Sequence, residues 1–79
     1  MENKEKISDL GLATLLLTLQ YELVGLERAD EKRINFIFNR SDGFDEAVSN
    51  FWSNTEISIS VQALFNNNKL LKNRLYSIK

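Results

Sequence analysis

The sequence predicts a small α+β domain in which a short three-stranded sheet is packed by helices, in the order α-β-β-α-β-α. Three observations lead to this prediction. Apolar residues recur at helical spacing in three segments, they alternate with polar residues in three others, and turn-forming residues separate the segments. A sheet covered by helices buries all of these apolar faces. We expect residues 1–6 to be a disordered tail and residues 7–79 to form a single α+β domain.

The first helix is expected to run to residue 19. Ser8 or Asp9 can cap its start by accepting hydrogen bonds from free backbone N–H groups. Its apolar residues occupy much of the helix circumference: Ile7, Leu10, Leu12, Ala13, Leu15, Leu16, Leu17 and Leu19. Such a helix is buried centrally or covered by another chain.

Two strands are expected at residues 21–28 and 33–40, joined by the polar link ADEK, which is short enough for a β-hairpin. In the second strand, Ile34, Phe36 and Phe38 share one face, the pattern of a half-buried strand. The segment ISISV at residues 57–61 alternates in the same way and predicts a third strand.

The two remaining helices are predicted at residues 42–53 and 60–79. Ser41 or Asp42 can cap the former, and Asp45 and Glu46 lie in its first turn, where carboxylates complement the helix dipole. Ser60 can start the last helix. Its expected inner positions are Val61, Leu64, Phe65, Asn68, Leu71, Leu75 and Ile78.

The chain resembles a small prokaryotic and phage domain family of unknown function. The resemblance covers about residues 7–76 and is carried by ISDLGLATLLLTLQYELVGLE, INFIFN and SVQALFNNNKLLKNRLYS. Gln20 departs from the pattern, because the family's glycine is expected there before the tyrosine, and a left-handed helix end favours glycine. The resemblance implies an α+β fold and a cytoplasmic setting. It implies no catalytic residues.

Enzyme chemistry has little support, and we expect the protein not to be an enzyme. Without histidine or cysteine there is no imidazole base and no thiol nucleophile. The three glycines are isolated, so no phosphate-binding or dinucleotide motif is formed, and we expect no cofactor. Asp42, Asp45 and Glu46 could gather a hard cation. Capping and dipole compensation explain the same acids more simply, so we expect no metal site.

Charge is distributed unevenly along a chain of net charge −1. The last helix contains the cations Lys69, Lys72, Arg74 and Lys79 and no acid. Lys69 and Lys72 can share a face with Asn66 and Asn73, while Arg74 projects from the adjacent flank. These side chains are candidate contacts to nucleic acid or to another partner. The sequence pI of about 5.3 favours a solvated helix face over nucleic acid.

Three further residues are candidate dimer or core contacts. Asn68 lies among apolar positions, where it could bond to a neighbouring strand, pair across a dimer axis or lie at the edge near water. Phe51 and Trp52 form core or, if exposed, a binding surface, whereas Tyr76 is expected in the core or at its edge. We therefore predict a non-catalytic protein-interaction module that forms a homodimer. The alternative is a small nucleic-acid-binding accessory protein that uses the basic last helix.

The N-terminal segment does not predict secretion. Glu2, Glu5 and Asp9 interrupt its basic residues, and no small-residue cleavage site follows the apolar run. Leu10–Leu19 is too short to cross a bilayer, which needs about 20 residues. We expect a cytoplasmic protein without a membrane partner.

Overall fold

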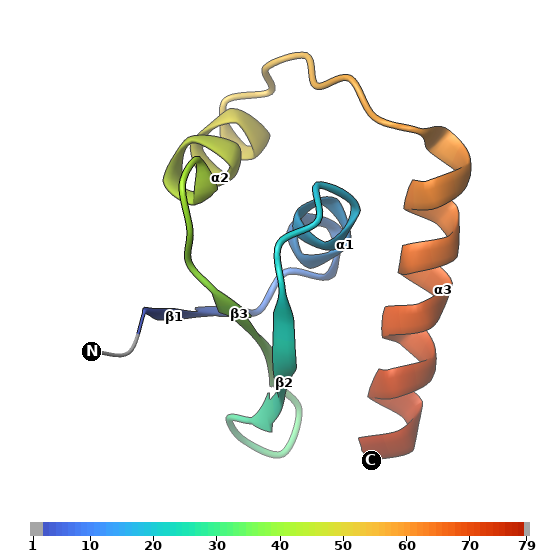
Figure 1. Cartoon of the computed structure of the whole chain (residues 1–79). Helices are drawn as coiled ribbons and strands as arrows, with labels where there is room; N and C mark the ends of the chain where they lie inside the picture. Colours follow the sequence, from blue (N-terminus) through green and yellow to red (C-terminus); the bar gives the residue numbers. More distant parts are fainter. Residues whose placement is uncertain (1–2, 79) are drawn as a thin grey trace.

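The computed structural model describes residues 3–78 of the chain, which form three strands and three helices (Figure 1). Their bounds are β1 (Lys4–Ile7), α1 (Leu10–Thr18), β2 (Leu23–Arg28), β3 (Ile34–Asn39), α2 (Phe44–Trp52) and α3 (Val61–Ile78). The predicted class, an α+β fold with a three-stranded sheet packed by helices, is confirmed. One strand occupies a different place in the order, which is β-α-β-β-α-α.

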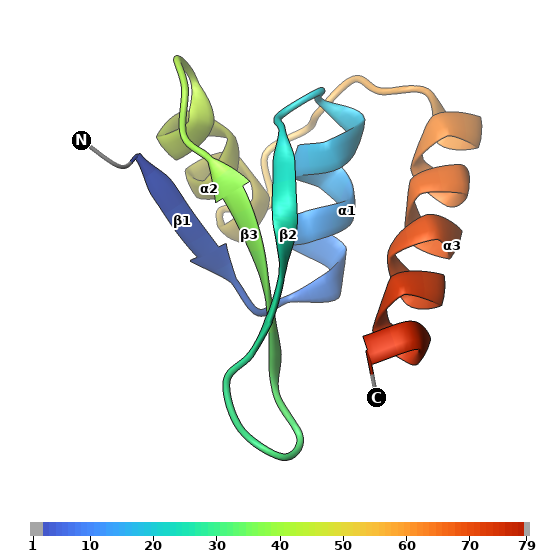
Figure 2. The ribbon, with the colours of Figure 1, turned by 60° about the horizontal axis from the view of Figure 1, so that its bottom comes forward.

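The sheet has the strand order β1-β3-β2, and both neighbours of β3 are antiparallel to it (Figure 2). Phe36 and Phe38 lie on the covered face, because both belong to the buried cluster that includes residues of all three helices. Ile37 and its polar neighbours Asn35 and Asn39 alternate with them and point to the opposite face. The fold therefore has two layers, with the helices gathered against one face of the sheet.

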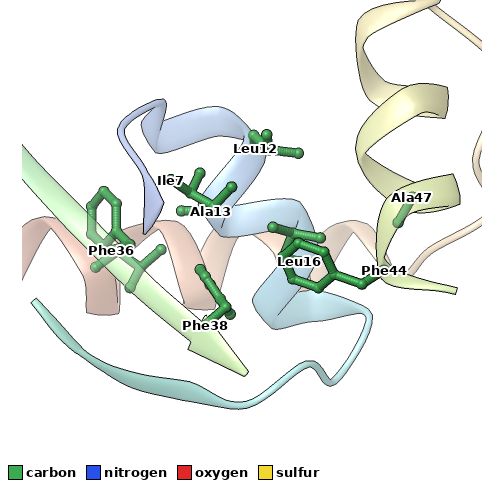
Figure 3. Packing of buried hydrophobic residues seen from close by; sticks show 9 residues of the cluster. Ile7, Leu12, Ala13, Leu16, Phe36, Phe38, Phe44 and Ala47 are labelled. Carbon is green, nitrogen blue, oxygen red and sulfur yellow. The ribbon is translucent and has the colours of Figure 1, made fainter. Parts of the chain in front are cut away.

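The core lies where α1 meets β3, α2 and α3 (Figure 3). Five consecutive residues of α1, Leu12 to Leu16, are buried, so the prediction that this helix lies centrally is confirmed within one chain. Phe44 attaches α2 to the sheet, with its ring centroid 5.2 Å from that of Tyr21 and 6.4 Å from that of Phe38. Leu71 is the fully buried residue among positions 61–77 of α3, for which burial is described.

The N-terminal segment differs from the expected tail. Lys4–Ile7 form β1 and pair with β3, with Ile7 opposite Phe36, while residues 1–2 lie outside the described residues. Hydrophobicity gives no sign of this strand, because backbone hydrogen bonds hold it and its only buried side chain is Ile7. Charged side chains at Lys4, Glu5 and Lys6 are typical of an edge strand that avoids pairing with other chains.

The strand predicted at residues 57–61 is not formed. Ile57 and Ile59 are half-buried and Ser58 and Ser60 exposed, so the alternation correctly indicates one-sided burial. It does not indicate pairing, because the segment lies beside neither edge strand of the sheet, whose order is β1-β3-β2. The segment is instead part of the linker from α2 to α3 (Figure 1), and Val61 begins α3.

Two of the predicted helix caps are confirmed and one is wrong. The Leu12 amide donates to Oδ1 of Asp9 (2.9 Å), and the Ala63 amide donates to Oγ of Ser60 (3.2 Å). At α2 the cap position is Gly43, with φ of 85° and no side-chain hydrogen bond, instead of Ser41 or Asp42. This left-handed conformation suits glycine, and a Cβ there would lie 2.9 Å from the Tyr21 hydroxyl.

Gln20, the position where the family resemblance led us to expect glycine, has a left-handed backbone with φ of 75°. The Tyr21 amide donates to the Leu16 carbonyl (3.0 Å) and the Gln20 amide to the Leu17 carbonyl (3.0 Å). This pair of bonds is the Schellman arrangement that ends a helix. Asn54, with φ of 63°, takes the equivalent place after α2, and asparagine tolerates this conformation better than glutamine does.

Gln20→Gly is therefore expected to stabilise the protein. Relief of the left-handed strain should raise the free energy of unfolding by about 0.5–1 kcal/mol. This is the net value, because the larger conformational entropy of glycine in the unfolded chain offsets part of the gain. Chemical denaturation measures the change. Gln62→Gly, the same substitution at an exposed site within α3, is the control and should destabilise by about 1 kcal/mol. Equal losses in both variants would contradict the assigned strain.

Helix α3 is longer than the helix it packs against. Its 18 residues span about 27 Å and the 9 residues of α1 about 14 Å, so its ends extend past the contact. Val61 and Phe65, both expected to be internal, are consequently 62% and 66% exposed. This overhang leaves apolar surface beside the linker.

Candidate functional site

A cleft of about 720 Å³ opens between the start of α1, the β2–β3 hairpin, the end of α2 and the C-terminal half of α3. We call it the aromatic–cationic cleft. It is lined by Ser8, Asp9, Leu10, Lys32, Arg33, Ile34, Phe36, Trp52, Lys72, Leu75 and Tyr76. The volume is in the range of ligand-binding clefts, roughly 300–1,000 Å³.

Two large aromatic side chains border the cleft and remain accessible to solvent. Trp52 is 62% exposed and Tyr76 is 70% exposed. Phe51 contacts the Trp52 ring edge-to-face, with centroids 4.9 Å apart and an interplanar angle of 86°. Phe51 itself packs against the core cluster, so its contact with the indole holds the Trp52 ring in place. The rest of the Trp52 ring is exposed to solvent.

The charge of the cleft is mainly positive. Lys32, Arg33 and Lys72 line it, against one acid, Asp9, whose Oδ1 accepts the capping hydrogen bond from Leu12. The ion pairs of Lys6 with Glu27 and of Arg40 with Glu5 and Asp45, all within residues 3–78, use no cation of the cleft. Lys32, Arg33 and Lys72 make none of these ion pairs and can therefore attract an anionic ligand.

Asp30 positions the hairpin that supplies two of these cations. Its Oδ1 accepts hydrogen bonds from the backbone amides of Lys32 (2.9 Å) and Arg33 (2.8 Å). This side-chain-to-backbone turn explains how the link closes without glycine or asparagine. The same two bonds, together with the nearby Arg33 charge, lower the pKa of Asp30 below its ordinary value.

A pH titration should show this local role. Because the pKa is lower in the folded protein, the turn contribution is complete above the ordinary aspartate pKa of about 3.9 and disappears as pH falls through the lowered pKa. We expect the Lys32 and Arg33 amide resonances to shift in that acidic range with Asp30, as measured by NMR. Asp30→Ala should remove the transition, and a transition that persists in this variant would contradict the assignment.

The structure separates the residues predicted to contact nucleic acid or a partner. Lys72 alone among them lines the aromatic–cationic cleft. Lys69, Asn66 and Asn73 are exposed on α3 outside it. Arg74 is exposed on the opposite flank, about 160° around the helix from Lys72. Lys79 lies outside the described residues.

The candidate dimer or core contacts also occupy different surroundings. Nδ2 of Asn68 donates to Oγ1 of Thr14 (3.1 Å), and next to it Nδ2 of Asn67 donates to Oγ1 of Thr18 (3.0 Å). Asn68 thus has an intrachain partner on a helix, whereas a strand, a dimer axis or water was expected from the sequence. Phe51 is half-buried at the edge of the core, and Trp52 is exposed in the cleft.

Three residues of the cleft were not predicted from the sequence. Tyr76 was assigned to the core or its edge, but it lies about 140° around α3 from the buried Leu71, a position that a helical projection would have placed outside. Lys32 was assigned only to the polar link and Arg33 only to the start of a strand. Nothing in the local sequence shows that the hairpin folds beside the end of α2.

The acidic residues at the start of α2, which were considered above as ligands of a hard cation, make other contacts in the structure. Asp45 pairs with Arg40, and both Asp45 and Glu46 occupy the first turn of the helix as predicted. The main-chain carbonyl of Asp42 accepts a hydrogen bond from the Tyr21 hydroxyl (3.1 Å). Within residues 3–78, no group of three or more acidic side chains is arranged to hold a metal ion.

The described helices are all too short or too polar to cross a membrane. Fold and site together define a small α+β domain with an exposed, cationic cleft bordered by aromatic rings. The chain belongs to the family described as a domain of unknown function (DUF5659), whose model matches residues 2–77. No curated protein and no solved structure matches the chain.

Proposed function

We propose that this protein is a non-catalytic interaction module of the cytoplasm, which binds an acidic segment of a partner protein and also self-associates. The observation that carries the proposal is the exposed Trp52 ring beside Lys72, Lys32 and Arg33 in one cleft. Tryptophan, tyrosine and arginine are the residues most enriched among the dominant contacts of protein interfaces. A segment with one or two carboxylates next to an apolar side chain complements both features.

Nucleic acid fits this surface less well. The cations do not form a continuous track along α3, since Arg74 lies on the flank opposite Lys72. Asp9 lines the cleft, and Asp30 and Glu31 at the hairpin tip adjoin its cations, so a phosphate chain would meet acids there. The whole chain has a net charge of −1. These features favour a ligand with few, locally placed negative charges.

We propose a non-catalytic role because of the types of side chain that the protein contains. The chain has neither histidine nor cysteine, which excludes imidazole and thiol catalysis. Asp9, the one acid among the residues that line the cleft, already accepts the capping bond of α1. Binding is therefore the activity that these side chains support, and no cofactor is required for it.

Selection from a random 12-residue peptide library on the immobilised protein tests the proposal. Peptides that combine one or two acidic residues with an apolar residue should be enriched. Lys72→Glu should weaken binding of an enriched peptide at least ~10-fold, since it reverses a charge in the cleft. Binding should also weaken as salt rises from about 50 to 200 mM.

Arg74→Glu is the matched control, because it makes the same charge change on the opposite flank of the same helix. It should leave peptide binding within about 2-fold of the wild type, allowing for the weak effect of a screened, distant charge. Enrichment of no acidic peptide, or equal losses in the two variants, would contradict the proposed use of the cleft. A 12-nucleotide single strand that binds more tightly than any peptide, with a steep salt dependence, would favour the nucleic-acid alternative.

A further inference from the structure

The linker between α2 and α3 contains a segment that has the pattern of a strand but no strand partner. Ile57 and Ile59 face inward and Ser58 and Ser60 outward. Within the described part of the chain, the backbone groups of Glu56, Ile57, Ser58 and Ile59 make no hydrogen bond to other protein groups. Figure 1 shows this linker as a coil between the two helices, without a strand beside it. Its backbone is free to pair with another strand.

An apolar groove adjoins this segment. It has a volume of about 450 Å³ and is lined by Gly11, Thr14, Leu15, Phe51, Ile57, Ile59, Leu64, Phe65 and Asn68. Phe65 and Val61 on the overhanging start of α3 extend the apolar surface into solvent. A groove beside exposed aromatic and aliphatic side chains is typical of a protein–protein contact.

We propose that a second copy of this chain covers this surface, with residues 56–60 of the two copies paired as antiparallel strands about a two-fold axis at Ser58. In this register Ile57 of one copy is opposite Ile59 of the other, so the isoleucines of both copies lie on the same face. The exposed Phe65 side chains then approach each other across the axis. This inference rests on the self-association proposed above and is independent of the aromatic–cationic cleft.

Charge supports a second copy as the occupant. The first turn of α3 contains no acidic residue, unlike that of α2, so the positive end of its dipole lacks a carboxylate. In the symmetric pair, Glu56 of one copy is opposite Ser60 of the other, which caps α3. The carboxylate of each copy thus reaches the helix start of its neighbour.

The segment also differs from β1, one of the two edge strands of the sheet. β1 has a charged side chain at Lys4, Glu5 and Lys6, a composition that discourages pairing between chains. Residues 57–60 are isoleucine and serine and contain no charge. The contact is small, so we expect a reversible dimer with a Kd on the order of 10–100 µM.

Two matched experiments test this surface. In sedimentation equilibrium from about 5 µM to 1 mM, the wild type should approach twice its monomer mass of 9.1 kDa. Phe65→Asp should remain monomeric. Tyr76→Asp makes an equivalent change at an exposed aromatic of the same helix, and it should dimerise like the wild type while losing peptide binding in the cleft.

A cysteine introduced in place of Ser58 tests the register directly, since the natural chain has no cysteine. Opposite residues in an antiparallel pair have Cα atoms about 4.5–5.5 Å apart, within disulfide range. Under mild oxidation, Ser58→Cys should form a covalent dimer at least ~10-fold faster than Ser49→Cys on the exposed surface of α2, and Phe65→Asp should remove the difference.

The outcomes separate the two proposals. A dimer that is unaffected by Phe65→Asp, and that crosslinks no faster in the Ser58→Cys variant than in the Ser49→Cys variant, would overturn this surface but not self-association. A wild type that is still monomeric at 1 mM would overturn both this surface and the proposed self-association. Peptide binding by Lys72 and its neighbours is measured separately, so its failure leaves the dimer surface standing.

Discussion

Leu71→Ala is expected to lower the free energy of unfolding by about 3 kcal/mol, within the range of 2–5 kcal/mol for buried leucine-to-alanine changes. Leu71 is the fully buried anchor of α3, and the polar contacts from Asn67 and Asn68 to α1 depend on the helix being docked. A domain of this size unfolds at a temperature about 12–24 °C lower after a loss of about 3 kcal/mol. Thermal denaturation by circular dichroism measures the change.

The neighbouring residue is the control for this prediction. Leu70 is 45% exposed on the flank of the same helix, so Leu70→Ala should lower the stability by about 1 kcal/mol or less. Similar losses for the two variants would show that α3 is not held to α1 through Leu71. Because α3 forms one wall of both the cleft and the apolar groove, its docking is a condition for each proposal.

Phe44→Ala should have a comparable or larger effect, about 3–5 kcal/mol. The Phe44 side chain is buried between Tyr21 and Phe38 and holds α2 against the sheet. Replacement by alanine leaves a cavity and removes both the aromatic contacts and the buried apolar area of the ring. Urea denaturation gives the free energy difference directly.

Phe44→Ala should also affect the aromatic–cationic cleft. α2 carries Trp52 at its last residue, so loosening the helix should also weaken peptide binding in the cleft. Phe65→Ala, measured below about 5 µM where we expect monomers, is the matched control at a site 66% exposed and should change stability by less than about 1 kcal/mol. A Phe44→Ala variant as stable as Phe65→Ala would contradict the assigned core.

Side-chain periodicity was sufficient to predict most of the fold. The strong apolar pattern of α1, the alternation of β3 and the side-chain caps at Asp9 and Ser60 all depend on local sequence, and the structure confirms them. The strand β1 was missed because its stability comes from backbone pairing with β3, which lies about 30 residues away in sequence. At residues 57–60 the opposite error occurred, since alternating burial was taken for backbone pairing.

The site was less predictable, for a related reason. Lys72 and Trp52 were singled out because helix position and side-chain type could be read locally. Their proximity depends on how α2 and α3 pack around α1, and Lys32 and Arg33 join them only because the hairpin reaches the same place. The spread of Lys69, Arg74 and the asparagines around α3 follows from helix geometry, but which flank faces the cleft depends on the burial of Leu71.

The fluorescence of Trp52, the single tryptophan of the chain, tests whether an accessible aromatic ring lies in a cationic cleft. At low salt, the ratio of iodide to caesium quenching should be higher for Trp52 than for free N-acetyltryptophanamide, because Lys32, Arg33 and Lys72 concentrate anions and repel cations around the ring. Lys72→Glu should reduce this ratio, whereas Arg74→Glu should leave it nearly unchanged. A ratio in the wild type that equals or falls below that of N-acetyltryptophanamide would contradict a cationic cleft around Trp52.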